Sequence, residues 1–71
     1  MKHRYALTTT LLQVEREARG LSRAELGRLA RVDGSLISKV EKRRPLLYGP
    51  PRERLAAVLA VEADRLEELV R

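Results

Sequence analysis

Small and hydrogen-bonding residues recur between residues 33 and 42 at a spacing that places them on one side of a helix. Four of them stand at i, i+1, i+4 and i+5: Gly34, Ser35, Ser38 and Lys39. Ile37 and Val40 fall between them and are apolar, so a helix would turn this pair inward and the other four outward. A lysine donates to the O6 and N7 acceptors of guanine, and a serine can donate or accept. The spacing predicts an outer helix face able to read a nucleic-acid groove.

No constellation for catalysis or metal binding accompanies this face. The chain has no cysteine, which excludes a disulfide framework and a thiolate zinc site, and its single histidine, His3, has no ligand companions. No nucleophile stands beside a base, and no glycine-rich phosphate loop is present. We therefore expect no enzyme, no metal and no cofactor.

The basic residues concentrate in the same half of the chain. Of 71 residues, the first 44 hold eleven Lys/Arg against five Asp/Glu, whereas residues 45–71 hold four against five. A positive surface attracts a polyanion, although a solvated basic face without a partner is the alternative interpretation. Phe and Trp are absent, so the chain has no aromatic platform on which single strands could stack. Duplex DNA is the predicted polyanion.

The elements that must position these residues are helical throughout. No run of alternating β-branched residues indicates a strand, and 71 residues supply a single domain with a small core. We predict a flexible basic N-terminal arm over residues 1–7 and one domain over residues 8–71. Its five predicted helices begin near residues 8–10, 22, 33, 52 and 63 and end near residues 19, 30, 42, 60 and 70.

Side chains that can cap a helix mark three of these starts. A hydroxyl within Thr8–Thr10 precedes the first helix, Ser22 and Glu25 form a capping-box pattern before the second, and Asp33 precedes the third. Gly20 predicts a left-handed end to the first helix. The apolar residues expected to face inward from the first four helices are Leu11, Val14, Ala18, Leu21, Leu26, Leu29, Ala30, Ile37, Val40, Leu55, Val58 and Leu59. The fifth helix carries Leu66 and Leu69.

A tight turn at Arg31 is predicted to join the second and third helices. Gly27 falls midway along the second helix, and Val32 and Ile37 bracket the start of the third. Two helices that cross steeply need a small residue at their contact and apolar residues beside the turn. Residues 21–41 therefore favour a DNA-binding pair of helices; the alternative is an ordinary helical hairpin in a small bundle.

Over roughly residues 11–70 the sequence resembles the phage-repressor type of helix-turn-helix domain, also called Cro-like or Xre-like. The matching segments are Arg16–Ser22, Glu25–Gly27, Val32 with Ile37–Glu41, and Leu59–Val61 leading into Leu66. The resemblance implies an all-α, compact, lambda-repressor-like bundle of five helices. It also implies sequence-specific binding of double-stranded DNA, usually as a dimer, in transcriptional regulation. Because no apolar run is long enough to span a membrane, we expect a cytoplasmic regulator of bacterial or phage type, with repression as its favoured role.

The resemblance also assigns roles to individual residues, with helix 33–42 in the major groove. The implied base contacts are Gly34, Ser35, Ser38 and Lys39. The implied phosphate contacts are Ser22, Arg23, Lys42, Arg43 and Arg44. Arg16 and Glu41 occupy the places of an ion pair between the first helix and the end of the third, which is a structural role.

Three departures from the family pattern limit this transfer. The family commonly has Gln where Arg23 stands, and Gly after the glutamate, where this chain has Lys42 and Arg43. The loop before the fourth helix is also three or four residues longer, which supplies residues 46–49. This loop could pack on the core or present an apolar surface to a partner protein.

A homodimer is predicted, because one small domain covers only a short half-site. Leu66, Leu69 and Val70 form the first candidate interface and the 46–49 loop the second, whereas in a monomer these residues would serve the chain's own core. A second class of function stays open: a protein-interaction module on a helix-turn-helix scaffold, such as an antitoxin or a phage regulatory partner. A scaffold that no longer binds DNA would not need the basic residues. A double-stranded RNA binder is a third option, although the deep, narrow RNA major groove would not admit a helix.

Overall fold

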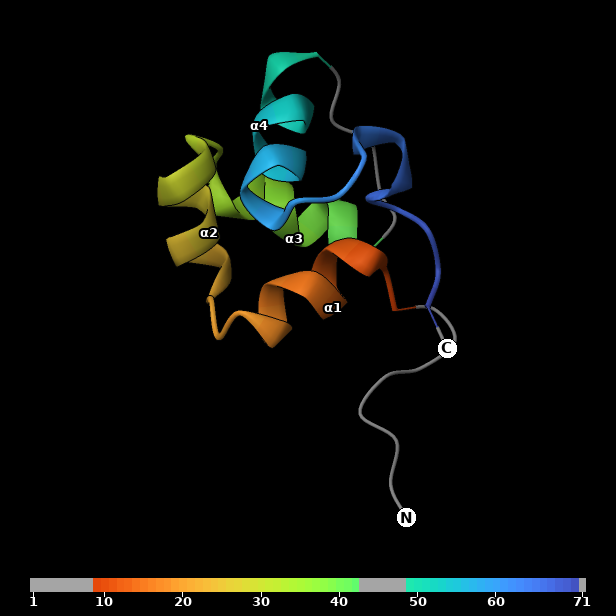
Figure 1. The fold of residues 1–71 in the computed structure, drawn as a ribbon. Helices are drawn as coiled ribbons and strands as arrows, with labels where there is room; N and C mark the ends of the chain where they lie inside the picture. The colour runs from red at the N-terminus through yellow and green to blue at the C-terminus, as the bar shows by residue number, and fades with distance from the viewer. Residues whose placement is uncertain (1–8, 43–48, 71) are drawn as a thin grey trace.

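The computed structural model describes residues 9–42 and 49–70, and this part of the chain is all-α (Figure 1). It contains four α-helices and one 3-10 turn: α1 Leu11–Ala18, α2 Arg23–Ala30, α3 Gly34–Glu41, α4 Pro50–Leu59 and η1 Ala63–Arg65. α2 packs against α3 and α4, and α4 also contacts α1 and η1. Within these described residues no strand forms, and one isolated bridge joins Thr10 to Leu69. The predicted all-α class is confirmed.

The α-helix predicted over residues 63–70 does not form. η1 supplies one 3-10 turn, after which the backbone pairs with the start of α1. The carbonyls of Leu66 and Glu68 accept the N–H groups of Leu12 and Leu11 at 3.0 and 2.7 Å. These N–H groups belong to the first turn of α1, which has no partners within its own helix. A helix this short is marginal by itself, so the long-range pairing prevails.

α1 is capped at both ends by the residues predicted to do so. The Thr10 hydroxyl accepts the N–H of Gln13 at 3.2 Å. Gly20, at φ +67°, ends the helix, and the next N–H, that of Leu21, donates to the Arg16 carbonyl at 3.1 Å. A positive φ at this position is one that glycine adopts without steric cost.

The predicted caps and turn between α2 and α3 are also present. The Ser22 hydroxyl accepts the N–H of Glu25 at 3.0 Å, and the Glu25 carboxylate accepts the N–H of Ser22 at 2.7 Å. Arg31 ends α2 in the left-handed region, with φ 57° and ψ 48°. Asp33 then begins α3 by accepting the N–H of Ser35 at 2.9 Å. Local hydrogen-bond chemistry thus fixes where both helices begin and where α2 ends.

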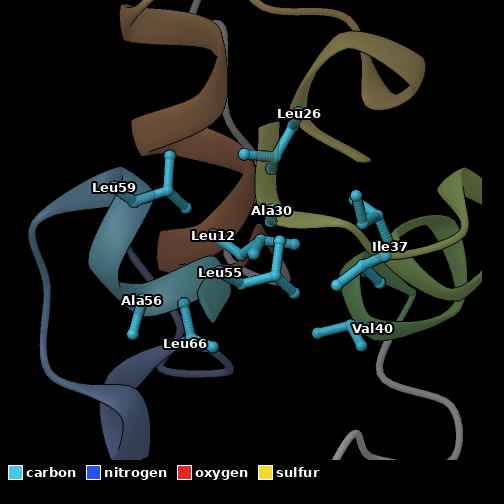
Figure 2. Packing of buried hydrophobic residues seen from close by; sticks show 10 residues of the cluster. Leu12, Leu26, Ala30, Ile37, Val40, Leu55, Ala56, Leu59 and Leu66 are labelled. Carbon is cyan, nitrogen blue, oxygen red and sulfur yellow. The ribbon is translucent and has the colours of Figure 1, made fainter. Parts of the chain in front are cut away.

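The core draws apolar side chains from all four helices and from the segment after η1 (Figure 2). Its buried members are Leu12, Leu26, Ala30, Val32, Ile37, Val40, Leu55, Ala56, Leu59 and Leu66. Among the residues expected to face inward, Leu11, Leu26, Ala30, Ile37, Val40, Leu55 and Leu59 are confirmed. Leu66, predicted for a dimer interface, is instead completely buried in the core.

Two inward assignments were wrong, and two core residues, Leu12 and Ala56, were not predicted. Ala18 is exposed, while the unpredicted Leu12 is completely buried, because α1 turns Arg16 toward the interior and its buried side rotates accordingly. Leu29 is 60% exposed, since α2 buries the stripe that contains Leu26 and Ala30 and leaves Leu29 outside it. The predicted face of α1 assumed apolar residues alone and could not anticipate a buried arginine.

Candidate nucleic-acid interface

Two glycines let α2 and the start of α3 approach closely. A Cβ on Gly27 would lie well inside 3.0 Å of the Val32 carbonyl oxygen, a separation that real Cβ atoms essentially never show. A Cβ on Gly34 would face the Arg23 carbonyl and Ala24 at ordinary contact distances of 3.6 to 3.7 Å. Gly34 therefore packs toward α2. Gly34 is half-buried and so lies at the edge of the predicted outer face of α3, because α2 is close to the start of α3.

The outward face of α3 is a stripe of three exposed residues. Ser35, Lys39 and Lys42 stand at i, i+4 and i+7 and are all exposed. Ser38 is half-buried, and it lies with Gly34 on the adjacent stripe, nearer to α2. Of the four predicted base contacts, Ser35 and Lys39 thus point most directly to solvent, with Lys42 extending the same stripe.

Two carboxylates near this face are held by backbone N–H groups. The backbone N–H of Ser35 lowers the pKa of Asp33, and the backbone N–H of Ser22 lowers the pKa of Glu25. A hydrogen bond to the charged form of a carboxyl group favours ionisation. Both side chains are therefore anionic caps at neutral pH. Ser22, a predicted phosphate contact, accepts a hydrogen bond in its capping box and keeps its own hydroxyl proton to donate.

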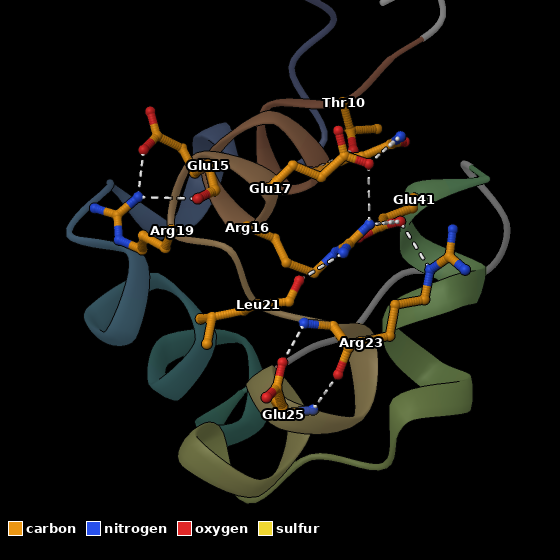
Figure 3. A network of polar contacts seen from close by, with 11 residues as sticks. Thr10, Glu15, Arg16, Glu17, Arg19, Leu21, Arg23, Glu25 and Glu41 are labelled. Atoms are coloured by element: carbon orange, nitrogen blue, oxygen red, sulfur yellow. Dashed lines mark hydrogen bonds and ion pairs between the residues drawn. The ribbon is translucent and has the colours of Figure 1, made fainter. Parts of the chain in front are cut away.

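The predicted ion pair between α1 and the end of α3 is present and almost completely buried (Figure 3). Arg16 Nε donates to Glu41 Oε2 at 2.6 Å and Nη2 donates to Oε1 at 3.2 Å, while Nη1 donates to the Leu21 carbonyl at 2.8 Å. The exposed fractions of the two side chains are 8% for Arg16 and 1% for Glu41. A bidentate pair of this kind satisfies charges that burial would otherwise penalise.

Arg23 also binds the Glu41 carboxylate, a contact that the sequence did not predict. Its Nε donates to Glu41 Oε1 at 2.9 Å, so Glu41 bridges α1 and α2 through two arginines. The Arg23 side chain is nevertheless 45% exposed, and the only hydrogen bond that it makes within the described residues comes from Nε. Its two Nη groups remain available for an external acceptor such as a phosphate.

Most of the described arginines are committed to contacts inside the fold. Six of the eight make hydrogen bonds or salt bridges: Arg16, Arg19, Arg23, Arg52, Arg54 and Arg65. Some of them cap helices, since Arg54 donates to the Ala30 carbonyl at 2.7 Å and Arg19 donates to the Leu59 carbonyl at 2.8 Å. These carbonyls close α2 and α4, where a helix leaves acceptors without partners. Much of the arginine content is therefore structural.

The cations without such contacts gather on α2, the turn and α3. Within residues 9–42 and 49–70, the cationic side chains that make no hydrogen bond or salt bridge are Arg28, Arg31, Lys39 and Lys42. The carboxylates without one lie on α4 and around η1: Glu53, Glu62 and Asp64. The fold thus separates its uncommitted charges. Arg28 and Arg31 were not predicted as site residues, although their spacing at i and i+3 on the polar side of α2 was visible in the sequence.

Some predicted residues lie outside the described part of the chain. These are Arg43, Arg44, residues 46–48 of the long loop, and the arm over residues 1–7. Gly49, the last loop residue, is described and begins α4 at φ +68°. Among the described residues, no group of three His, Cys, Asp or Glu side chains could hold a metal ion. No described helix has the length and apolar character needed to cross a membrane.

No protein-family model, curated protein or solved structure matches the chain.

Proposed function

We propose that the chain is a sequence-specific duplex-DNA-binding transcriptional regulator in which α2, the Arg31 turn and α3 act as a helix-turn-helix. The observation that carries this proposal is the separation of charge: the described cations that make no hydrogen bond or salt bridge lie between Arg28 and Lys42. A polyanion is the complement of such a surface. The exposed stripe of α3 supplies hydrogen-bonding side chains in the middle of it.

Dimensions and local geometry support α3 as the helix that enters the major groove. The groove is about 12 Å wide and admits one α-helix of about 10–12 Å diameter. α3 presents Ser35 and Lys39 outward, while Ile37 and Val40 anchor it in the core. In this proposal Lys39 and Ser35 contact base edges, with Ser38 and the backbone at Gly34 beside them. Adenine is read poorly, because the chain has no Asn and its only Gln lies on α1.

Phosphate contacts in this proposal flank α3. Arg23 offers its Nη groups at the start of α2, Ser22 offers its hydroxyl proton, and Lys42 is exposed at the C-cap of α3. The basic residues Arg43 and Arg44 follow directly in the sequence. Such contacts orient a protein on the duplex without selecting a base.

Binding to duplex DNA is expected to weaken steeply with salt. Each phosphate that a cation neutralises contributes about −0.9 to the slope of log affinity against log salt. The four predicted cationic contacts per protomer would weaken binding on the order of a hundredfold between 50 and 200 mM salt. Fluorescence-anisotropy titrations of duplexes selected from a random pool measure this slope. Absent binding at 50 mM salt, or a flat response, would refute the proposed function.

Lys39→Ala is expected to weaken binding to the selected site by roughly 1–3 kcal/mol and binding to random duplexes by less, because a base contact discriminates between sequences. Lys42→Ala is the matched control from the same stripe of α3. As a phosphate contact, Lys42 should affect both kinds of duplex alike. Titrating both variants against both duplexes measures the difference. Equal losses for Lys39→Ala on the two duplexes would reduce Lys39 to a phosphate contact.

We also propose that the regulator binds as a homodimer, through Leu69 and Val70 and without Leu66. Leu66 is completely buried in the chain's own core and is not available to a partner. Leu69 remains 41% exposed and Val70 half-buried beside it. A dimer would place two α3 helices about 34 Å apart on one face of the duplex. Sedimentation of the saturated complexes of the salt titration reports the stoichiometry.

Exposed leucines favour the second candidate function, a protein-interaction module. Leu29 on α2 is 60% exposed and Leu36 on α3 is 37% exposed. Apolar side chains at the surface can mark a protein contact when they form a continuous patch. A chain that served only such a contact would show no salt-dependent affinity for DNA.

A further inference from the structure

A shallow basic groove of about 660 Å³ opens between α2, the Arg31 turn and the start of α3. Three arginines line it, Arg23, Arg28 and Arg31, against a single carboxylate, that of Asp33. We propose that this groove binds a phosphodiester of the duplex backbone through Arg28 and Arg31, in addition to the contacts beside α3. The inference rests on the proposed function and extends its footprint across α2.

Arg28 and Arg31 differ from the other described arginines in having guanidinium groups that are available to bind a phosphate. Arg28 and Arg31 are exposed and are the two described arginines whose guanidinium groups make no hydrogen bond or salt bridge. A guanidinium group presents planar, paired donors that match the oxygens of a phosphate. Arg28 and Arg31 line the same groove. Arg23 lines it as well, and its Nη nitrogens make no hydrogen bond to the described residues.

The groove is positively charged because three guanidinium groups line it against one carboxylate. Asp33 Oδ1 accepts the N–H of Ser35, and no salt bridge links Asp33 to any described arginine. Glu41, which holds Arg23, is itself shared with Arg16. An anion entering the groove therefore meets three guanidinium groups and one capping carboxylate.

The backbone at Arg31 supports a role for its side chain. Arg31 ends α2 at φ 57°, in the left-handed region where glycine fits with less strain. The Arg31 carbonyl accepts a hydrogen bond from Arg54 Nη2 at 2.9 Å, a contact that any residue could make through its backbone. The Arg31 side chain makes no hydrogen bond or salt bridge within the described residues, whereas it adds a positive charge to the groove.

Charge removal within the groove tests the proposal. Arg28→Gln removes one charge from α2, and Arg31→Asn removes one while keeping a residue that tolerates the left-handed region. Arg65→Gln is the matched control, because it removes one exposed arginine that pairs with Glu68 away from the groove. Circular dichroism and thermal melts establish that all three variants remain folded.

Each groove variant is expected to reduce the magnitude of the DNA salt slope by about 0.9 and to weaken binding about eightfold at 0.1 M salt, on selected and random duplexes alike. Arg65→Gln should change the slope by far less. If wild-type protein binds DNA and the groove variants match Arg65→Gln, the groove assignment is overturned while the proposed function stands. Failure of wild-type protein to bind DNA overturns both.

A titration with inorganic phosphate separates the two sources of a phosphate group. The arginine Nε–H signals of wild-type protein are followed by NMR as inorganic phosphate is added. Specific shifts at Arg28 and Arg31, together with unchanged DNA salt slopes in the variants, would assign the groove to free phosphate and overturn its role on the duplex. Reduced slopes in the variants support the backbone phosphodiester.

Discussion

Replacing Glu41 by alanine is expected to destabilise the folded chain by about 3–5 kcal/mol, because it removes one partner of a buried ion pair and leaves the other unpaired. Glu41 accepts from Arg16 at 2.6 and 3.2 Å and from Arg23 at 2.9 Å. A single domain of this size has only a few kcal/mol of net stability. We therefore expect Glu41→Ala to be largely unfolded at 25 °C, measured by circular dichroism and urea denaturation.

The control for this prediction is an exposed pair in the same chain. Glu68→Ala breaks the contact with Arg65, whose two side chains are about half exposed, and should leave the unfolding midpoint nearly unchanged. The double variant Arg16→Met with Glu41→Leu should recover much of the lost stability, because it removes both buried charges of the pair. Retention of wild-type stability by Glu41→Ala would contradict this prediction and show that Arg16 carries no penalty when it is unpaired.

The same network explains why the sequence predicted some of the core and not the rest. Ile37 and Val40 were predictable, because an amphipathic helix turns its apolar residues inward. Leu12 was not, since the buried side of α1 is set by Arg16 reaching Glu41, 25 residues away. The inward prediction for Leu29 was wrong for a related reason. α2 is only eight residues long, and its buried side consists of Leu26, Gly27 and Ala30. Contacts between elements that are distant in the sequence, polar for α1 and apolar for α2, thus decide which side of each helix is buried.

Helix boundaries show the same division between local and long-range causes. The capping box at Ser22 and the left-handed glycine at Gly20 are satisfied by atoms within five residues, so the sequence alone located them. The segment after η1 pairs with Leu11 and Leu12, more than fifty residues earlier in the chain. No periodicity within residues 63–70 could reveal that partner, and the predicted fifth helix was wrong.

The candidate interface divides in the same way. Ser35 and Lys39 were placed on an exposed face by helical spacing alone. Arg23 required knowledge of Glu41, which takes its Nε. The sequence contains twelve arginines and does not show which of them make hydrogen bonds or salt bridges inside the fold. Arg28 and Arg31 could therefore not be distinguished from the other described arginines by sequence alone.

Gly27→Ala is expected to destabilise the fold by about 3 kcal/mol, at the upper end of what overpacking usually costs. In an ordinary helix interior the same change would stabilise by up to about 1 kcal/mol. Here the added methyl would meet the Val32 carbonyl oxygen, a backbone atom that cannot rotate away. The Gly27 carbonyl also accepts the Val32 N–H at 2.9 Å, so the turn has little freedom to shift. Urea denaturation of the variant measures the loss.

Gly34→Ala supplies the matched comparison, because it adds the same methyl group on the facing side of the α2–α3 contact. Its Cβ would lie 3.6 to 3.7 Å from Arg23 and Ala24, which is ordinary van der Waals contact. Alanine is also the better helix former, so stability should be unchanged or higher by up to about 1 kcal/mol. Opposite signs for the two substitutions would establish that α2 meets the turn at Gly27. Equal tolerance of both would mean that the turn can move, and that α3 is not held rigidly enough for its exposed stripe to read a sequence.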